Sequence, residues 1–161
     1  QVPHVQERIG EIVVNLEMLR ACVRAAETDA SLNEWGVMCP AFGPLTAARA
    51  MFAGTMYPRM AEIIQLLGSS SLMGLPTEAD FTAEISPELE KYLATDSTGA
   101  QDRVRLFHLA WDVACSAFGG RQTLYERFFG GDPVRNTMLL YQGYNKSPAM
   151  ARVQQFLERE G

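Results

Sequence analysis

Two glycine pairs, each preceded by a phenylalanine, are the residues of this chain best suited to holding a ligand. They lie at 118–120 and 129–131, about three helical turns apart. Because glycine has no side chain, such a pair lets a ligand approach the backbone closely and adopts torsions that other residues resist. Arg121 and Arg127 stand near the pairs, and each can hold a phosphate group through two hydrogen bonds. Glycine backbone without side chains, flat aromatic rings and arginine cations together indicate a dinucleotide cofactor.

The same segment also has a plain structural interpretation. Each glycine pair can be a turn between two helices, with its aromatic neighbours tucked into the core. Asp132 followed by Pro133 is typical of a helix start, with the aspartate as N-cap and the proline at the first helical position. Asp132 is therefore expected to be at least partly structural.

The hydrophobic pattern predicts an all-α chain, because apolar residues recur at helical spacing and no convincing period-two alternation occurs. The segment 44–67 is rich in alanine and methionine, which indicates close packing, and Pro58 inside it is expected to kink the helix. Gly119-Gly120 is expected to end a later helix. The predicted helices are 5–27, 44–67, 87–94, 100–118, 121–128, 133–143 and 147–159, with 32–43 and 72–85 as loops.

Local signals set the expected ends of several elements. Ser86 before Pro87 predicts an N-cap followed by proline at the first helical position. Thr77 is expected to bond forward to the backbone N–H of Asp80, which is a capping contact. Gly68 and the three serines after it are expected to stop the helix 44–67.

Composition limits the class of protein. The chain has 161 residues, enough for one domain with a proper core. Its net charge of −5 and the lack of any basic run argue against a nucleic-acid partner. No apolar run approaches the roughly 20 residues of a membrane helix, and no signal peptide is visible.

Cysteine usage and the first residues suggest the context of the chain. Cys22, Cys39 and Cys115 are odd in number and lack metal-type spacing, so we expect no disulfide framework and a reducing, cytoplasmic compartment. Gln1 is not an initiator, and a helical pattern follows at once without a capping sequence. We therefore expect a single domain, 1–161, that is the C-terminal piece of a larger polypeptide.

The segment 125–135, Tyr-Glu-Arg-Phe-Phe-Gly-Gly-Asp-Pro-Val-Arg, resembles the C-terminal signature of a known enzyme family. This is the 4-hydroxyphenylacetate 3-monooxygenase (large oxygenase component) family of two-component, FADH2-dependent phenol hydroxylases. The segment 75–81, Leu-Pro-Thr-Glu-Ala-Asp-Phe, also occurs in this form there. The resemblance implies a helical bundle like the C-terminal domain of acyl-CoA dehydrogenases, with extra C-terminal helices.

The resemblance also implies an activity. In the family, a separate flavin reductase supplies FADH2, oxygen adds at flavin C4a, and the hydroperoxide hydroxylates a phenol ortho or para to its hydroxyl. The phenol is a small molecule or is tethered to a carrier. The residues that contact the phenol lie in N-terminal and central regions that this chain lacks, so no catalytic residue and no metal ligand is assigned here. The implied role is part of the flavin site and the helical core of a homotetramer.

The implied cofactor-binding residues fall in two segments. The first is the serine turn after the helix 44–67, at the position where acyl-CoA dehydrogenases carry a Gly-Gly motif that touches flavin or adenine across a subunit boundary. Serine hydroxyls can donate hydrogen bonds to phosphate or to flavin carbonyls. The second segment holds both glycine pairs. The implied residues are Ser69, Ser70, Phe118, Gly119, Gly120, Arg121, Tyr125, Arg127, Phe128, Phe129, Gly130, Gly131 and Asp132.

Two other functions remain open at this stage. A flavin and iron–sulfur enzyme, 4-hydroxybutyryl-CoA dehydratase/vinylacetyl-CoA isomerase, shares the fold family and uses His and Cys ligands. His108 and Cys115 are seven residues apart and so face one side of a helix, but a cluster needs about four ligands. A partly buried His108 beside Trp111 explains the residue more simply. The last alternative is a helical assembly module without a retained site.

Overall fold

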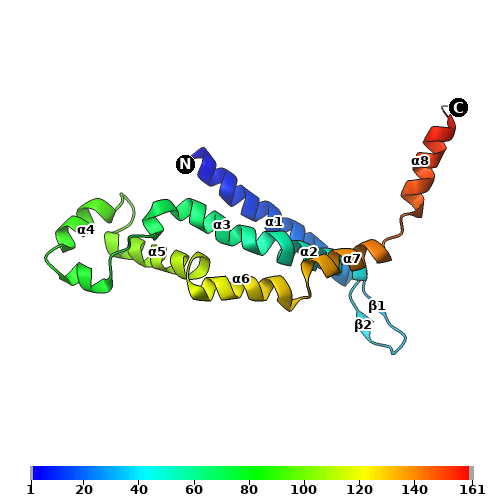
Figure 1. The fold of residues 1–161 in the computed structure, drawn as a ribbon, viewed down its shortest axis with the longest axis horizontal. Coiled ribbons are helices and arrows are strands. Elements are labelled where there is room, and N and C mark those ends of the chain that lie inside the picture. Colours follow the sequence, from blue (N-terminus) through cyan, green and yellow to red (C-terminus); the bar gives the residue numbers. More distant parts are fainter. Residues whose placement is uncertain (1, 160–161) are drawn as a thin grey trace.

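The computed structural model describes residues 2–159, which form an elongated and almost wholly helical molecule (Figure 1). The prediction of an all-α fold is confirmed, with one small hairpin as the only sheet in the described residues. In chain order the elements are α1 (Pro3–Thr28), β1 (Ser31–Leu32), β2 (Met38–Cys39), α2 (Phe42–Met51), the π-helix η1 (Phe52–Met56), α3 (Tyr57–Gly68), the 3-10 turns η2 (Ser69–Leu72) and η3 (Glu78–Thr82), α4 (Ser86–Leu93), α5 (Ala100–Ala114), α6 (Ala117–Phe129), α7 (Pro133–Gly143) and α8 (Ser147–Arg159).

The body of the molecule is a bundle in which α2 and α3 lie in the middle. α1 runs back along α2 and α3, while α5 and α6 follow one another along the other side of α3, and α7 packs on α2 (Figure 1). Small side chains at the centre allow this close approach, and Ile63 in α3 is completely buried. The buried apolar residues of α2, η1 and α3 are Ala48, Ala53, Met56 and Ile63. Burial of Ile63 contributes about 1.5–3 kcal/mol.

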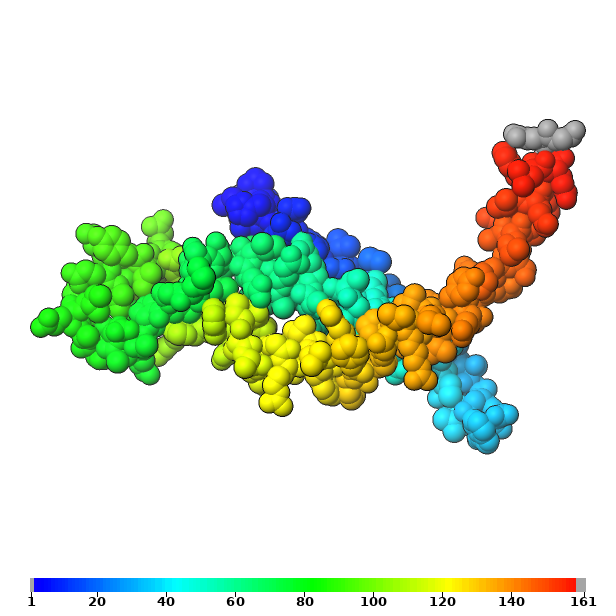
Figure 2. Space-filling model, in the orientation of Figure 1, coloured from blue at the N-terminus to red at the C-terminus, as the bar shows by residue number. Residues whose placement is uncertain are grey.

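Two parts project from this body. The β1–β2 hairpin extends at one end, and α8 stands away from the bundle (Figure 2). Much apolar surface is also exposed on α1, where Ile9, Val13 and Leu16 are 50%, 50% and 42% accessible. The helix 5–27 therefore has the predicted apolar stripe, but this chain alone does not cover it. Within residues 2–159, no helix combines the length and the apolar character needed to cross a membrane.

Pro58 is accommodated by a π-helix rather than by a break in the helix 44–67. Proline has no N–H to donate to the carbonyl four residues earlier. Here η1 precedes it, and the N–H of Tyr57 donates to the carbonyl of Phe52, five residues back. The single predicted helix is thus an α–π–α series that begins at Phe42 and ends at Gly68.

Several sequence predictions about element boundaries are wrong. The helix 100–118 ends at Ala114, and Gly119-Gly120 lies in the first turn of α6 instead of ending α5. Ser116 is the reason, because its hydroxyl caps a new helix there. Ser86 is not an N-cap: α4 starts at Ser86 itself, since Ile85 already has helical torsions. The expected loop 32–43 holds the β1–β2 hairpin.

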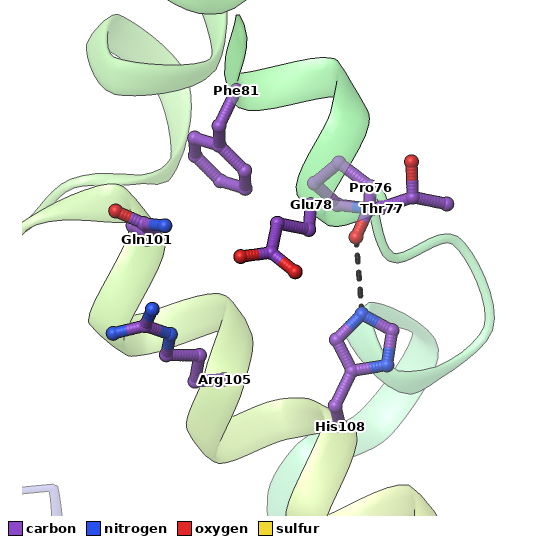
Figure 3. Close-up of a pocket in the computed structure, with 7 residues that line it drawn as sticks. All are labelled: Pro76, Thr77, Glu78, Phe81, Gln101, Arg105 and His108. Carbon is purple, nitrogen blue, oxygen red and sulfur yellow. Dashed lines mark hydrogen bonds between the residues drawn. The ribbon is translucent and has the colours of Figure 1, made fainter.

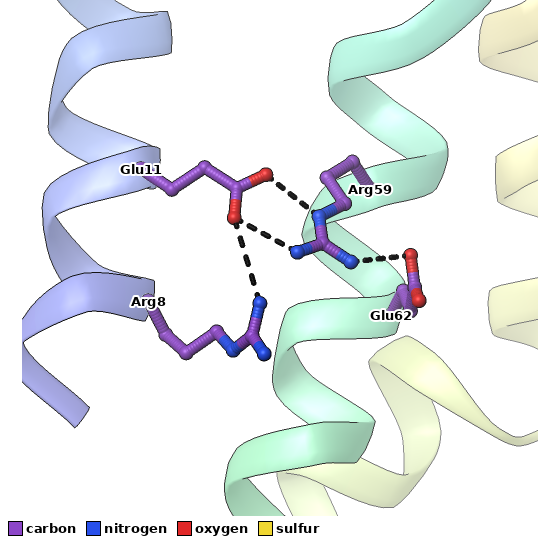
Figure 4. Close-up of polar contacts among 4 residues, drawn as sticks. All are labelled: Arg8, Glu11, Arg59 and Glu62. Atoms are coloured by element: carbon purple, nitrogen blue, oxygen red, sulfur yellow. Dashed lines mark hydrogen bonds and ion pairs between the residues drawn. The ribbon is translucent and has the colours of Figure 1, made fainter. Parts of the chain in front are cut away.

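An arginine holds α1 against α3 (Figure 4). Arg59 donates from Nε and Nη2 to the two carboxylate oxygens of Glu11, at 2.6 Å and 2.9 Å. Its Nη1 lies 2.7 Å from Oε2 of Glu62 on the same helix. This bidentate hydrogen bonding, and then the charge of the guanidinium, lowers the pKa of Glu11.

Replacing Glu11 should change the acid sensitivity of the fold. The pKa of Glu11 is lower in the folded protein than its ordinary value of 4.5. The ion pair therefore stabilises the fold fully at pH values above 4.5, and this contribution is lost as the pH falls through the lowered pKa. We expect the melting temperature of Glu11→Gln to lie below that of the wild type at neutral pH, with the gap closing as the pH falls through the lowered pKa of Glu11. Thermal unfolding from neutral to acid pH measures it.

Glu17→Gln is the matched control. Among residues 2–159, Glu17 pairs only with Arg20, three residues away on the exposed face of α1 at 2.6 Å, so its loss should matter little at any pH. A melting difference for Glu11→Gln that stays constant down to acid pH would contradict the role given to the ion pair.

Candidate cofactor-binding site

The first glycine pair is placed by the junction between α5 and α6. The hydroxyl of Ser116 donates to the carbonyl of Asp112 at 2.7 Å and accepts from the N–H of Gly119 at 3.2 Å. This pair of bonds ends one helix and caps the next within two residues. As a result, residues 117–129 form one continuous helix.

The two glycines of this pair face different surroundings. A side chain on Gly119 would come within 2.3 Å and 2.6 Å of the carbonyl oxygens of Val113 and Asp112, so only glycine fits there. A side chain on Gly120 would meet nothing within 4 Å. Gly119 is therefore explained by packing inside this chain, whereas Gly120 is left open to an approaching group.

An aromatic stripe runs along the exposed side of α6. Phe118, Arg121, Tyr125 and Phe129 follow at spacings of three and four residues, which places them on one face of the helix. The rings of Tyr125 and Phe129 stack with centroids 4.8 Å apart and planes 25° from parallel. Phe118 and Phe129 are 70% and 73% accessible, so the stripe is not part of the core of this chain. We call these four residues the α6 stripe.

Arg127 lies away from the α6 stripe. It follows Tyr125 by two residues, which turns it about 200° around the helix, to the opposite side. Phe128 lies on the flank of the stripe and is 49% accessible. The structure therefore brings Arg121 together with the aromatic rings and does not bring Arg127 there.

The second glycine pair forms the turn between α6 and α7. Gly131 has a φ of +96°, which other residues rarely adopt, and its N–H donates to the carbonyl of Phe128 at 3.1 Å. Asp132 is an N-cap, as predicted, because its Oδ1 accepts from the N–H groups of Val134 and Arg135 at 2.7 Å and 3.2 Å. With its N–H used inside the turn, Gly131 cannot offer it to a phosphate.

Sequence reasoning missed the residue that holds this turn. Asn136 is 6% exposed, and its side-chain amide donates to the carbonyls of both Gly130 and Gly131, at 3.3 Å and 3.2 Å. Its position one turn into α7, after an N-cap and a proline, was the only available signal, and many surface asparagines share it.

The serine turn lies far from the glycine turn. η2 follows α3 and packs against α3 and the first half of α5. It therefore lies at the end of α3 that is away from α7 (Figure 1). The length of α6 alone separates them by about 20 Å. A single cofactor can meet Ser69 and Ser70 together with the α6 stripe only if it is extended or lies between two copies.

Ser69 carries backbone strain. Its φ of +49° and ψ of −148° make it the only non-glycine residue with positive φ among residues 2–159. Such strain typically costs about 1–3 kcal/mol, and it clusters where ligands bind.

Ser69→Gly should therefore stabilise the fold by about 1 kcal/mol, because glycine adopts this torsion freely. Chemical denaturation measures the change, and Ser70→Gly, at a residue with negative φ, is the control that should not gain stability. If Ser69→Gly lowers the stability instead, the strained torsion is not what this residue contributes.

A separate groove of about 460 Å³ lies between η3 and α5 (Figure 3). Arg105 and Gln101 on α5 face Glu78 across it. Nε2 of His108 is 3.0 Å from the carbonyl oxygen of Pro76, and since a carbonyl only accepts, that nitrogen carries the hydrogen. The predicted contact of Thr77 with Asp80 is part of a reciprocal capping box on the same wall.

The groove does not form the metal site considered for His108. Cys115 is the residue after α5 ends, so it no longer shares a regular helix face with His108. Throughout residues 2–159, no cluster of three or more His, Cys, Asp or Glu side chains is placed to hold a metal ion. All three cysteines are unpaired and half-buried.

Comparison with known proteins decides the family. The family model for the 4-hydroxyphenylacetate 3-hydroxylase C terminal (HpaB) matches residues 1–158. The chain belongs to this family. Within the HpaB family, the 4-hydroxyphenylacetate 3-monooxygenase oxygenase component of Thermus thermophilus is 48% identical over 96% of this chain and 32% of its own length. A probable 4-hydroxyphenylacetate 3-monooxygenase of Bacillus subtilis is 43% identical over 98% of this chain and 32% of its own length.

Solved structures agree with the HpaB assignment. The crystal structure of the HpaB oxygenase component complexed with FAD and 4-hydroxyphenylacetate matches with a TM-score of 0.89 and 46% identity, over 99% of this chain and 33% of that one. An archaeal 4-hydroxybutyryl-CoA dehydratase matches with a TM-score of 0.82 at 18% identity, over 98% of this chain and 32% of that one, which shows a shared fold alone. The chain spans about a third of the length of the relatives that it matches.

The described residues fit a flavin nucleotide in part. The α6 stripe places Arg121 on the same helix face as two stacked rings, and the open faces of Gly120 and Gly130 allow close approach, since a side chain at either would meet nothing within 4 Å. Arg127 and the N–H of Gly131 do not join that surface. The fit therefore centres on the α6 stripe.

Proposed function

We propose that this chain supplies part of the FADH2 site and the helical assembly surface of a two-component monooxygenase that hydroxylates a phenol. The observation that carries the proposal is the α6 stripe, a guanidinium and three aromatic rings exposed on one face of a helix between two glycine pairs. Isolated aromatic side chains on a surface are ordinary, but a contiguous exposed patch of this kind marks a binding site. FAD is bound in solved structures of HpaB relatives.

Each residue type of the proposed site has a distinct task. Arg121 pairs with a phosphate group, and the stacked rings of Tyr125 and Phe129 support a flat ring system. Gly120 and Gly130 let the cofactor lie against the backbone. Arg127 lies on the other face of α6 and takes no part in this contact, while Ser69 and Ser70 contact a more distant part or a cofactor held with another copy. Phe118 and Phe128 complete the proposed surface, and Gly119, Gly131 and Asp132 shape the backbone beside it.

Bound FADH2 would supply the chemistry that activates oxygen, and we assign the hydroxylation of the phenol to a C4a-hydroperoxide. The part of this chain is to bind the nucleotide, to orient it and to exclude water around it. We assign no catalytic residue within this chain. A flavin reductase is the proposed source of FADH2, and the phenol is a small molecule or is tethered to a carrier, as for the relative of Streptomyces globisporus named for a substrate on a peptidyl-carrier protein.

Assembly is the second part of the proposal. The half-exposed stripe on α1 and the isolated α8 present apolar surface that a lone chain leaves in water. We propose that it packs in a homotetramer and against the rest of the polypeptide, in the cytoplasm, with no nucleic-acid or membrane partner.

Anaerobic titration of the full-length protein with FADH2, followed by rapid mixing with oxygen, tests the function. We expect saturable binding and then a near-UV absorbance of a C4a-hydroperoxide. An iron–sulfur absorption band at rest would favour the dehydratase branch instead, and failure to bind FADH2 would leave an assembly module.

A further inference from the structure

We infer that Asn136 is a positioning residue that sets the backbone of the glycine turn for the cofactor, and this role rests on the proposed function of that turn. Its side chain lies beneath the turn between α6 and α7 and is 6% exposed. An asparagine buried to this degree must satisfy its amide within the protein. It does so by donating to the carbonyls of Gly130 and Gly131, at 3.3 Å and 3.2 Å.

These two bonds fix the direction of the peptide groups in the turn. In a trans peptide the N–H points opposite to the C=O. Because the carbonyl of Gly131 points in to Asn136, the N–H of Asp132 points away from it. That N–H has no hydrogen-bond partner within residues 2–159. The turn therefore presents one outward donor next to the open face of Gly130.

The chemistry around this donor selects its partner. The carboxylate of Asp132 caps α7 beside it, and a phosphate there would be repelled by that charge. A neutral acceptor, such as a ring carbonyl or ring nitrogen of the flavin nucleotide, has no such penalty. Asn136 thus orients the turn so that the N–H of Asp132 meets an acceptor on a ring of the cofactor. Arg121 remains the candidate for binding a phosphate.

Asn136 also leaves little room for a side chain at position 131. A Cβ on Gly131 would lie 3.1 Å from Oδ1 and 3.5 Å from Nδ2 of Asn136, on a backbone whose φ of +96° already disfavours it. Gly131 and Asn136 therefore act together to set one backbone conformation. Changing either should move the same peptide groups, so their effects on the cofactor should not add.

The test compares FADH2 binding by full-length variants under anaerobic conditions. We expect Asn136→Leu and Gly131→Ala each to weaken FADH2 binding by about tenfold or more, and the double variant to bind no worse than the weaker single one. Thr137→Val is the matched control, since Thr137 donates to the carbonyl of Pro133 at 2.8 Å on the same helix but does not touch the turn. It should bind within about twofold of the wild type.

Hydrogen exchange separates positioning from stability. In the wild type, FADH2 should slow exchange in the segment 128–136, and in folded Asn136→Leu it should not. FADH2 affinity and protection like those of the wild type in that variant would overturn the inference while leaving the proposed function intact. If Asn136→Leu fails to fold, the FADH2 affinity of Gly131→Ala is the deciding measurement. An affinity of Gly131→Ala equal to that of the wild type then overturns the inference. A wild type that binds no FADH2 overturns both.

Discussion

Gly119→Ala should destabilise the protein by about 1–3 kcal/mol or more, because the added methyl group has no room. The carbonyl oxygens of Val113 and Asp112 would lie 2.3 Å and 2.6 Å from it. These are backbone atoms at the end of α5, so relief requires that the whole junction between α5 and α6 shifts. Chemical denaturation of the full-length protein with a tryptophan signal measures the loss, since Trp111 lies at the same junction.

Gly120→Ala is the internal control for that experiment. It makes the same chemical change one residue later, where the methyl group meets nothing within 4 Å. Inside a helix, alanine is favoured over glycine by about 0.5–1 kcal/mol, so this variant should gain stability. Equal losses for the two variants would mean that the α5–α6 junction is not packed as described.

Arg121→Ala should weaken FADH2 binding about 10- to 100-fold, which is the loss expected for a charge-assisted hydrogen bond to phosphate. Among residues 2–159, Arg121 makes no ion pair, so its guanidinium is available to a ligand on the α6 stripe. The fold should be unaffected because the side chain is exposed. Anaerobic titration of the full-length variant measures the affinity.

Arg105→Ala is matched to Arg121→Ala in charge and exposure. Arg105 lies on α5 beside the groove near His108, 3.5 Å from Oδ1 of Asp102, and away from the α6 stripe. Its removal should change FADH2 affinity by less than about twofold. If both arginine variants weaken binding alike, general electrostatic attraction explains the effect and the contact to Arg121 is wrong.

The sequence was a good guide to helices and a poor one to their ends. Apolar periodicity identified the helical segments, and the ranges 133–143 and 147–159 agree with α7 and α8. The predicted end of α5 at Gly119-Gly120 is wrong because these glycines lie inside α6 and do not break a helix. The break comes from the Ser116 hydroxyl, which bonds to both neighbouring helices, and such a contact depends on a geometry that spacing alone does not reveal.

The residue types of the candidate site are readable from the sequence, but their arrangement is not. Phe118, Arg121 and Tyr125 fall on one face because α6 is continuous, whereas a helix broken at Gly120 would have left their relative direction open. The same continuity moves Arg127 to the other side. Asn136 was missed because burial beneath a glycine turn is a tertiary property, with no signal at helical spacing.

We propose that FADH2 lies against the α6 stripe, and a structure of the full-length protein in complex with FADH2, determined under anaerobic conditions, would reveal its position. We predict a flavin nucleotide on the rings of Tyr125 and Phe129, with a phosphate oxygen within hydrogen-bond distance of the Arg121 guanidinium. A cofactor bound elsewhere, with the α6 stripe covered by another part of the protein, would contradict the claim and leave this helix an assembly surface.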